Sequence, residues 1–169
     1  MNASWKVLGL LIVGAGLGVG CGDDGGGDGG GTGNADVTHS SLYEDGSRSI
    51  DGTIHFPDVP PGGTLGVFSL EYDDKDGVPT SESRSVSLDG GAPSVTYEVS
   101  GLEGGHPYHV SFLVDLDGSV TSSAGDWFGY FGGSVESPAL DLAAAQPISV
   151  DGGDATGQDF GLGVLSAAP

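Results

Sequence analysis

Positively charged residues are almost absent from this chain of 169 residues, which has 4 Lys and Arg against 24 Asp and Glu and a formal net charge of -20. The phosphates of a nucleic acid would meet net repulsion from such a chain, which argues against nucleic acid as a partner. Cysteine is nearly absent as well, since Cys21 is the only one. No disulfide can form within the chain, and a single leftover cysteine needs an explanation of its own.

Long apolar runs are also lacking. The longest, residues 7–20, has about 14 residues, whereas a transmembrane helix needs about 20. It follows a short head with one positive charge, Lys6, and it ends in small residues just before Cys21. This pattern is typical of a cleaved signal peptide, which the sequence predicts over residues 1–20.

Small residues, Gly18 to Gly20, lead directly into Cys21. They resemble the lipobox of bacterial lipoproteins, in which a small residue precedes a cysteine that receives diacylglycerol before cleavage. Gly20 fits this pattern. Gly18 departs from it, because the family prefers Leu at that position and Leu17 lies one place too far away. The resemblance implies a lipoprotein with palmitate or related acyl chains on Cys21; an ordinary secretory signal with a chance cysteine is the alternative.

Residues 22–34 are mostly glycine and aspartate and offer nothing for a hydrophobic core. The sequence therefore predicts a flexible tether over residues 21–35, with an r.m.s. reach of about 20 Å. Gly22 stands where an Asp is the familiar signal for retention in the inner membrane. The resemblance thus implies a lipid anchor in the outer membrane, either on its periplasmic face or at the cell surface.

From Asp36 onward, short alternating apolar runs are separated by turn residues. Val, Thr, Ser and aromatic residues dominate these runs, which indicates an all-β domain over residues 36–169. Seven or eight short strands at intervals of about 10–15 residues predict a single antiparallel β-sandwich. The predicted strands are 49–56, 64–72, 84–88, 94–100, 108–116, 126–131, 147–150 and 158–164.

One corner of this domain carries a more specific pattern. Gly101, Leu102 and Gly104 lie between two predicted strands, the second of which begins with Tyr108 and Val110. This arrangement resembles the strand–turn–strand of carboxypeptidase-regulatory-like domains, although the corner is longer here. The resemblance implies a transthyretin-like (prealbumin-like) sandwich in which Leu102 plugs one end, and it implies binding or scaffolding rather than catalysis.

An acidic loop offers a candidate metal site. Asp115, Asp117, Ser119 and Asp126 stand at the first, third, fifth and twelfth places of a calcium-loop spacing. The sixth place holds Val120 rather than glycine, and strands rather than helices flank the loop. Calcium is therefore the one cofactor that the sequence suggests, with a solvated hairpin turn as the alternative.

Aromatic residues follow this loop. Trp127, Tyr130 and Phe131 could form a ligand-binding surface, because exposed rings on a β-sheet stack on sugars or anchor protein partners. Alternation along a strand places Phe128 and Tyr130 on one side and Trp127 and Phe131 on the other. The alternative is that one set fills the core and the other covers an edge.

Catalytic signatures are missing. There is no Gly-x-Ser-x-Gly motif, and a lipidated Cys21 leaves no cysteine nucleophile. His106 and His109 are three residues apart and would point to opposite faces of a strand, so they do not predict a zinc pair. A carboxylate pair for glycoside hydrolysis stays open, although no pair stands out. The predicted function is a non-enzymatic, lipid-anchored binding or scaffolding domain with an unknown protein or glycan partner; a carbohydrate-binding module is the alternative.

Overall fold

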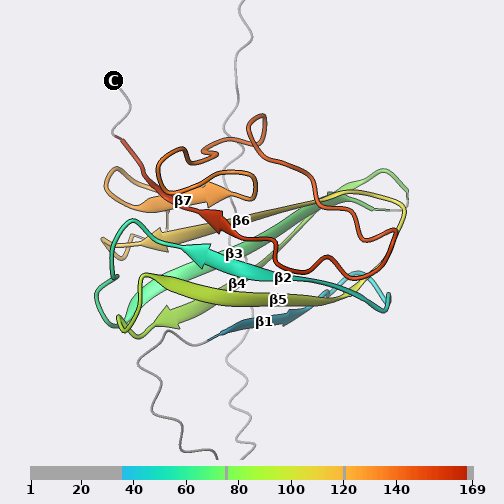
Figure 1. Ribbon diagram of the computed structural model, residues 1–169, viewed down its shortest axis with the longest axis horizontal. Coiled ribbons are helices and arrows are strands. Elements are labelled where there is room, and N and C mark those ends of the chain that lie inside the picture. Colours follow the sequence, from blue (N-terminus) through green and yellow to red (C-terminus); the bar gives the residue numbers. More distant parts are fainter. Residues whose placement is uncertain (1–35, 75, 120, 167–169) are drawn as a thin grey trace, which may run out of the picture. The chain divides into compact units, whose positions relative to one another are not determined.

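The computed structural model describes residues 36–74, 76–119 and 121–166. The predicted signal peptide, the predicted tether and Cys21 lie outside the described residues. Within them the chain forms strands and no helix, and the strands make two facing sheets (Figure 1). The prediction of an all-β sandwich is therefore confirmed.

The first sheet has four strands and the second has five. The order in the first sheet is β1 (Val37–Ser40), β5 (Ser94–Leu102), β2 (Arg48–His55) and β8 (Phe160–Gly161). The order in the second sheet is β4 (Pro79–Leu88), β3 (Thr64–Asp73), β6 (Tyr108–Asp115), β7 (Trp127–Tyr130) and β9 (Gly163–Val164).

Most neighbouring strands are antiparallel, as predicted, but two pairs at the sheet edges are parallel. β1 runs parallel to β5, and β8 runs parallel to β2. A parallel pair needs a long connection rather than a hairpin. Both pairs meet this requirement, because β1 lies at the start of the described chain and β8 follows the long connection after β7.

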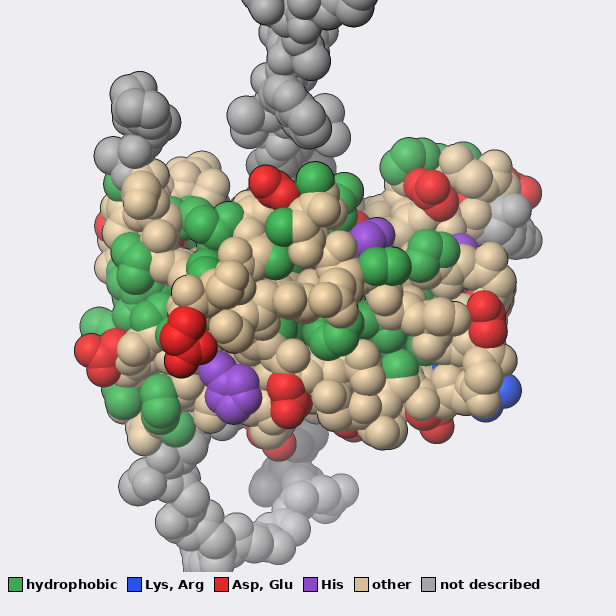
Figure 2. All heavy atoms as spheres, turned by 45° about the horizontal axis from the view of Figure 1, so that its top comes forward, with side chains coloured by type: hydrophobic (Ala, Val, Ile, Leu, Met, Phe, Trp, Pro, Cys, Tyr) green, Lys and Arg blue, Asp and Glu red, His purple; other side chains and the backbone are tan. Residues whose placement is uncertain are grey.

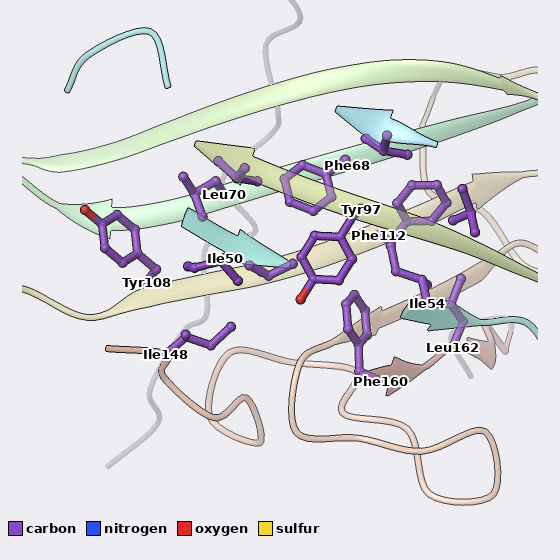
Figure 3. Close-up of a cluster of buried hydrophobic side chains, with 14 of the residues drawn as sticks. Ile50, Ile54, Phe68, Leu70, Tyr97, Tyr108, Phe112, Ile148, Phe160 and Leu162 are labelled. Atoms are coloured by element: carbon purple, nitrogen blue, oxygen red, sulfur yellow. The ribbon is translucent and has the colours of Figure 1, made fainter. Parts of the chain in front are cut away.

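The core lies between the sheets and follows the alternation of the strands. On β6 every second residue from Tyr108 to Val114 is fully buried. Rings from the two sheets meet across the core: the centroids of Phe68 on β3 and Tyr97 on β5 are 5.4 Å apart (Figure 3). This contact between sheets is what a two-layer architecture requires to exclude water.

The chain changes sheets near its end. The predicted strand 158–164 is split in two, because Phe160 and Gly161 pair with β2 whereas Gly163 and Val164 pair with β7. Leu162 lies between the two short strands, is fully buried, and donates its backbone N–H to His55 O at 2.9 Å. This crossing links the two sheets along one side of the sandwich.

Three other parts of the chain differ from the prediction. β1 was not predicted, and β4 begins at Pro79, five residues before the predicted 84. Residues 147–150 do not form a strand: Ile148 makes only an isolated bridge to Tyr108, although both Ile148 and Val150 are buried.

Candidate functional site

The loop between β6 and β7 brings three of the four predicted calcium ligands together. Carboxylate oxygens of Asp115, Asp117 and Asp126 all lie within 4.8 Å of one another. Asp115 ends β6 and Asp126 precedes β7, and both are buried, whereas Asp117 is exposed. The spacing in the sequence therefore predicted a real convergence in space.

Hydrogen bonds from within the loop hold these carboxylates in place. Asp126 Oδ1 accepts the backbone N–H of Leu116 at 2.9 Å, and Asp126 Oδ2 accepts that of Ser123 at 2.7 Å. The hydroxyl of Ser123 also donates to Asp117 Oδ2 at 2.8 Å. Asp115 Oδ1 accepts the backbone N–H of Gly118 at 2.8 Å.

Ser119, the fourth predicted ligand, contributes mainly through its backbone. Its N–H donates to Asp117 Oδ1 at 2.9 Å, while its hydroxyl donates to the carbonyl oxygen of Thr121 at 2.8 Å. Hydrogen bonds from Ser119 and then Ser123 lower the pKa of Asp117. Asp117 is thus negatively charged at neutral pH and adds its charge to the cluster.

Cations are scarce around this site. Among the described residues the only Lys or Arg side chains are Arg48, at the start of β2, and Arg84, on β4. Figure 2 shows acidic side chains around the rim of one face, with a cationic side chain at only one edge. Carboxylates held this close repel one another, and a divalent cation would relieve that repulsion.

The predicted aromatic residues do not share one exposed surface. Trp127 is only 7% exposed and packs 6.1 Å from Phe56 in the core. Phe131 is partly buried and packs against the same core. Trp127 therefore follows the alternative interpretation, in which inward rings fill the interior.

Tyr130 lies on the opposite side of β7. Its ring meets that of Phe128 edge-on at 5.2 Å, so the predicted alternation along this strand is confirmed for these two residues. The hydroxyl of Tyr130 donates to Glu71 Oε1 at 3.3 Å. Burial and the nearby Glu71 raise the pKa of Tyr130 to about 12, so this hydroxyl stays a donor at neutral pH.

Three comparisons with known proteins leave the family of this chain open. Comparisons with protein-family models, with curated proteins and with solved structures find no match. The described part of the chain also has no helix with the length and apolarity needed to cross a membrane. The chemistry of the site must therefore be read from its own geometry.

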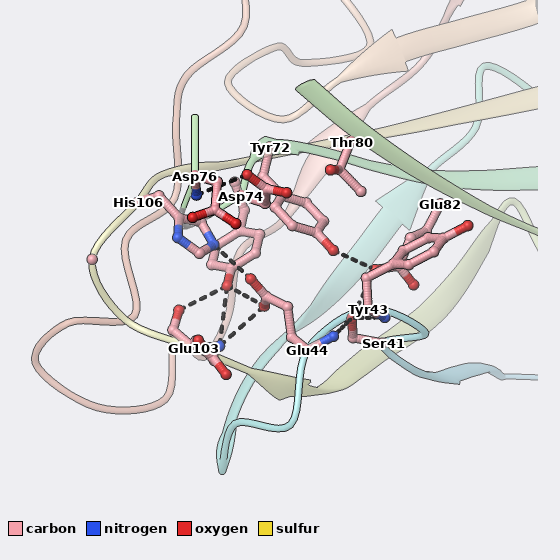
Figure 4. A network of polar contacts seen from close by, with 12 residues as sticks. Ser41, Tyr43, Glu44, Tyr72, Asp74, Asp76, Thr80, Glu82, Glu103 and His106 are labelled. Carbon is pink, nitrogen blue, oxygen red and sulfur yellow. Dashed lines mark hydrogen bonds and ion pairs between the residues drawn. The ribbon is translucent and has the colours of Figure 1, made fainter. Parts of the chain in front are cut away.

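A second polar cluster, which sequence reasoning missed, surrounds a buried carboxylate on β4 (Figure 4). Glu82 is 2% exposed and accepts hydrogen bonds from Ser41, Tyr72, His39 and the backbone of Leu42. The sequence did contain a signal for this cluster: Glu82 is a charged residue among serines, at an inward-facing position of the edge strand β4. The sequence alone could not show which donors it would meet.

Glu44 is the centre of a neighbouring group. Its carboxylate accepts hydrogen bonds from the hydroxyl of Tyr108 and the backbone N–H of Glu103, and it lies 2.7 Å from Nε2 of His106. The ring of His106 stacks on that of Tyr72, with centroids 5.4 Å apart.

Glu44 also lines an adjoining cavity of about 540 Å³, and the acidic residues around this cavity disfavour anionic ligands. The residues around this cavity are Tyr43, Glu44, Asp45, Asp74, Pro79, Thr80, Ser81 and Glu103.

Proposed function

We propose that this chain is an exported bacterial lipoprotein, anchored through acyl chains on Cys21, whose β-sandwich is a non-catalytic binding or scaffolding module. The observation that carries the proposal is the position of the one cysteine. It follows an apolar run of signal-peptide length, and the first described strand, at Val37, begins only a short glycine-rich stretch later. A free thiol in an oxidising compartment is a liability, and a thioether-linked lipid removes it.

The charge of the chain supports attachment by lipid rather than by the protein surface. A net charge of -20 is repelled by anionic lipid headgroups. Each buried CH₂ of an acyl chain contributes about 0.8 kcal/mol, so two or three chains hold a protein to a bilayer even against that repulsion. The proposed destination is the outer membrane, since Gly22 rather than Asp follows the cysteine.

The corner at Gly101 supports the proposed likeness to carboxypeptidase-regulatory-like domains. Gly101 has a φ of 80°, a conformation that glycine adopts without a steric penalty. The next residue, Leu102, is fully buried at the end of β5, where it was expected to plug the sandwich. The hydroxyl oxygen of Tyr108 accepts the backbone N–H of Glu103 at 3.1 Å, and this contact connects the corner to β6.

Mass spectrometry of the mature protein, purified from a bacterial host, tests the anchor directly. The expected N-terminal peptide begins at Cys21 and carries the added mass of diacylglycerol, with or without a further acyl chain. A mature protein that begins at another residue, or one whose Cys21 reacts as a free thiol, would contradict the proposal.

We also propose that Asp115, Asp117 and Asp126 hold a calcium ion. The donor set fits: three carboxylates converge from both ends of one loop, and calcium prefers carboxylate oxygens. Each carboxylate oxygen has two lone pairs, so an oxygen that accepts one backbone N–H still has capacity for a cation. Ser119, the fourth predicted ligand, offers at most the remaining lone pair of a hydroxyl that already donates to Thr121.

Thermal unfolding should reveal this ion. Calcium would bind the folded loop and not the unfolded chain, so calcium at 100 times its dissociation constant should add about 2.7 kcal/mol to the free energy of unfolding. The melting temperature should therefore be higher in calcium than in excess chelator. Asp117→Asn should abolish the calcium-dependent increment, since Asp117 is exposed and its loss costs little else. Asp141→Asn is the matched control, because Asp141 is also an exposed loop residue that accepts a backbone N–H, from Ala144 at 2.9 Å. Equal melting temperatures in calcium and in chelator would remove calcium from the proposal.

A further inference from the structure

The first strand of the sandwich has few backbone contacts. β1 spans Val37–Ser40, lies at the edge of its sheet, and pairs with β5 alone. Val37 packs into the hydrophobic core, and Ser41 and Gly46 of the following turn donate backbone N–H groups to the carbonyl oxygens of Ser100 and Gly101. The other contacts of this segment cross to β4 of the opposite sheet, where they converge on Glu82.

Hydrogen-bond donors occupy every acceptor position of the Glu82 carboxylate. Oε2 accepts from Nε2 of His39 at 3.0 Å and from the backbone N–H of Leu42 at 2.7 Å. Oε1 accepts from the hydroxyl of Ser41 at 2.7 Å and from that of Tyr72 at 2.8 Å. An ionised carboxylate has about four acceptor positions, and all four are used here. A proton on Glu82 must therefore displace one donor, and three of the four belong to residues 39–42.

His39 connects Glu82 to a second residue of β4, Arg84. Its Nδ1 accepts the Nε–H of Arg84 at 2.9 Å, so this nitrogen carries no proton and Nε2 is the one that donates to Glu82. His39, which is buried, thus joins β1 to two residues of β4 through hydrogen bonds on both of its ring nitrogens.

We propose that Glu82, His39 and Arg84 form an acid-labile latch that holds β1 and the following turn onto the sandwich at neutral pH and releases them in acid while the rest of the core stays folded. Release would leave residues 97–100 of β5 without their backbone partners.

The direction of the pH dependence follows from Glu82. Burial alone would raise its pKa, but the hydrogen bonds from Ser41, Leu42, Tyr72 and His39 outweigh burial and hold the pKa below its usual range. A depressed folded-state pKa contributes stability above the unfolded pKa of Glu, about 4.3, and that contribution is lost as the pH falls through the lower folded value. The latch should therefore hold above about pH 5 and open as the pH falls below the unfolded pKa of Glu and through the lower folded value.

The groups around the latch come from every neighbouring element. Tyr72 is kept protonated because burial and then Glu82 raise its pKa, so it remains a donor over the whole acidic range. Glu44 accepts hydrogen bonds from Tyr108 and from the backbone of Glu103. The charged or titratable side chains facing Glu82 or its partners are His39 on β1, Glu44 in the next loop, Tyr72 on β3, Arg84 on β4, and His106 and Tyr108 beyond Tyr72.

Hydrogen–deuterium exchange of the full-length protein tests the latch. Glu82→Gln imitates the protonated carboxyl at neutral pH, since the amide brings an N–H group against the same donors. At pH 7 we expect amides of residues 37–42 to exchange at least about tenfold faster than in the wild type, the size expected for lost hydrogen bonds to a charged group. Amides of β6 should keep their protection. Glu98→Gln is the matched control, because Glu98 is exposed on β5 and pairs with Thr38 of β1.

An acid series on the wild type provides the second measurement. After correction for intrinsic exchange rates, protection of residues 37–42 should fall between about pH 5 and pH 3 while β6 remains protected. If Glu82→Gln unfolds the whole domain, this series decides the question. Loss of protection in both segments at the same pH, or an unchanged rate for residues 37–42 in a folded Glu82→Gln variant, would overturn the proposal.

Discussion

Cys21→Ser is expected to move the protein from the membrane to the aqueous phase. On detergent phase partitioning, the wild type should enter the detergent phase almost completely, whereas the variant should remain almost completely in the aqueous phase. The physical reason is that two or three acyl chains contribute about 0.8 kcal/mol for each buried CH₂, and serine cannot form the thioether that carries the first of them. Metabolic labelling with palmitate should disappear in the same variant.

Gly22→Asp is the matched control for this variant. It keeps Cys21 and should keep both the lipid and the palmitate label, but it introduces the residue that resembles an inner-membrane retention signal. Separation of the two membranes should then find the variant in the inner one. The sandwich of both variants should melt at the wild-type temperature, because the substitutions lie outside it. A Cys21→Ser protein that still enters the detergent phase would show that the anchor is elsewhere.

Phe112→Ala should destabilise the domain by about 3–5 kcal/mol. Phe112 is fully buried on β6 and stacks on Phe56 with centroids 6.0 Å apart. It also fills the space that Gly66 leaves on β3, since a Cβ at position 66 would lie 2.5 Å from Cζ of Phe112. Removal of the ring leaves a cavity at a point where neighbouring strands cannot easily collapse.

Urea denaturation followed by tryptophan fluorescence measures this loss, since Trp127 lies in the same core. Domains of this size have a total stability of about 5–15 kcal/mol, so the variant should unfold at a much lower urea concentration. Leu113→Ala is the control, because Leu113 is the next residue on β6, points to the other side and is only half-buried. Equal losses from the two substitutions would mean that the interior is not organised as the strands indicate.

The strands with strong apolar alternation could be predicted from the sequence. Residues 108–116 were expected as the clearest strand, and β6 covers Tyr108–Asp115. A regular alternation fixes which residues face the core, and burial of that face then fixes the strand. The convergence of Asp115, Asp117 and Asp126 could likewise be predicted from the sequence, because all three lie in the loop between β6 and β7 or at its ends.

The elements that depend on distant partners could not be predicted. β1 has His39 at an inward position, and this residue is acceptable there only because Glu82, 43 residues later, accepts its hydrogen bond. The same carboxylate explains why the beginning of β4 was missed, since Glu82 breaks the apolar alternation. Ile148 is buried without forming a strand, because a side chain can cover the core from an irregular segment.

Because of the crossing at Leu162, the sheet edges on the two sides of the sandwich differ in their capacity to pair with a strand of another molecule. On that side the edge strands β8 and β9 have two residues each, too few for stable backbone pairing with a strand of another molecule. On the far side β4 presents ten residues and β1 four. Any strand pairing between two copies of the domain would therefore involve β1 or β4 and not β8 or β9.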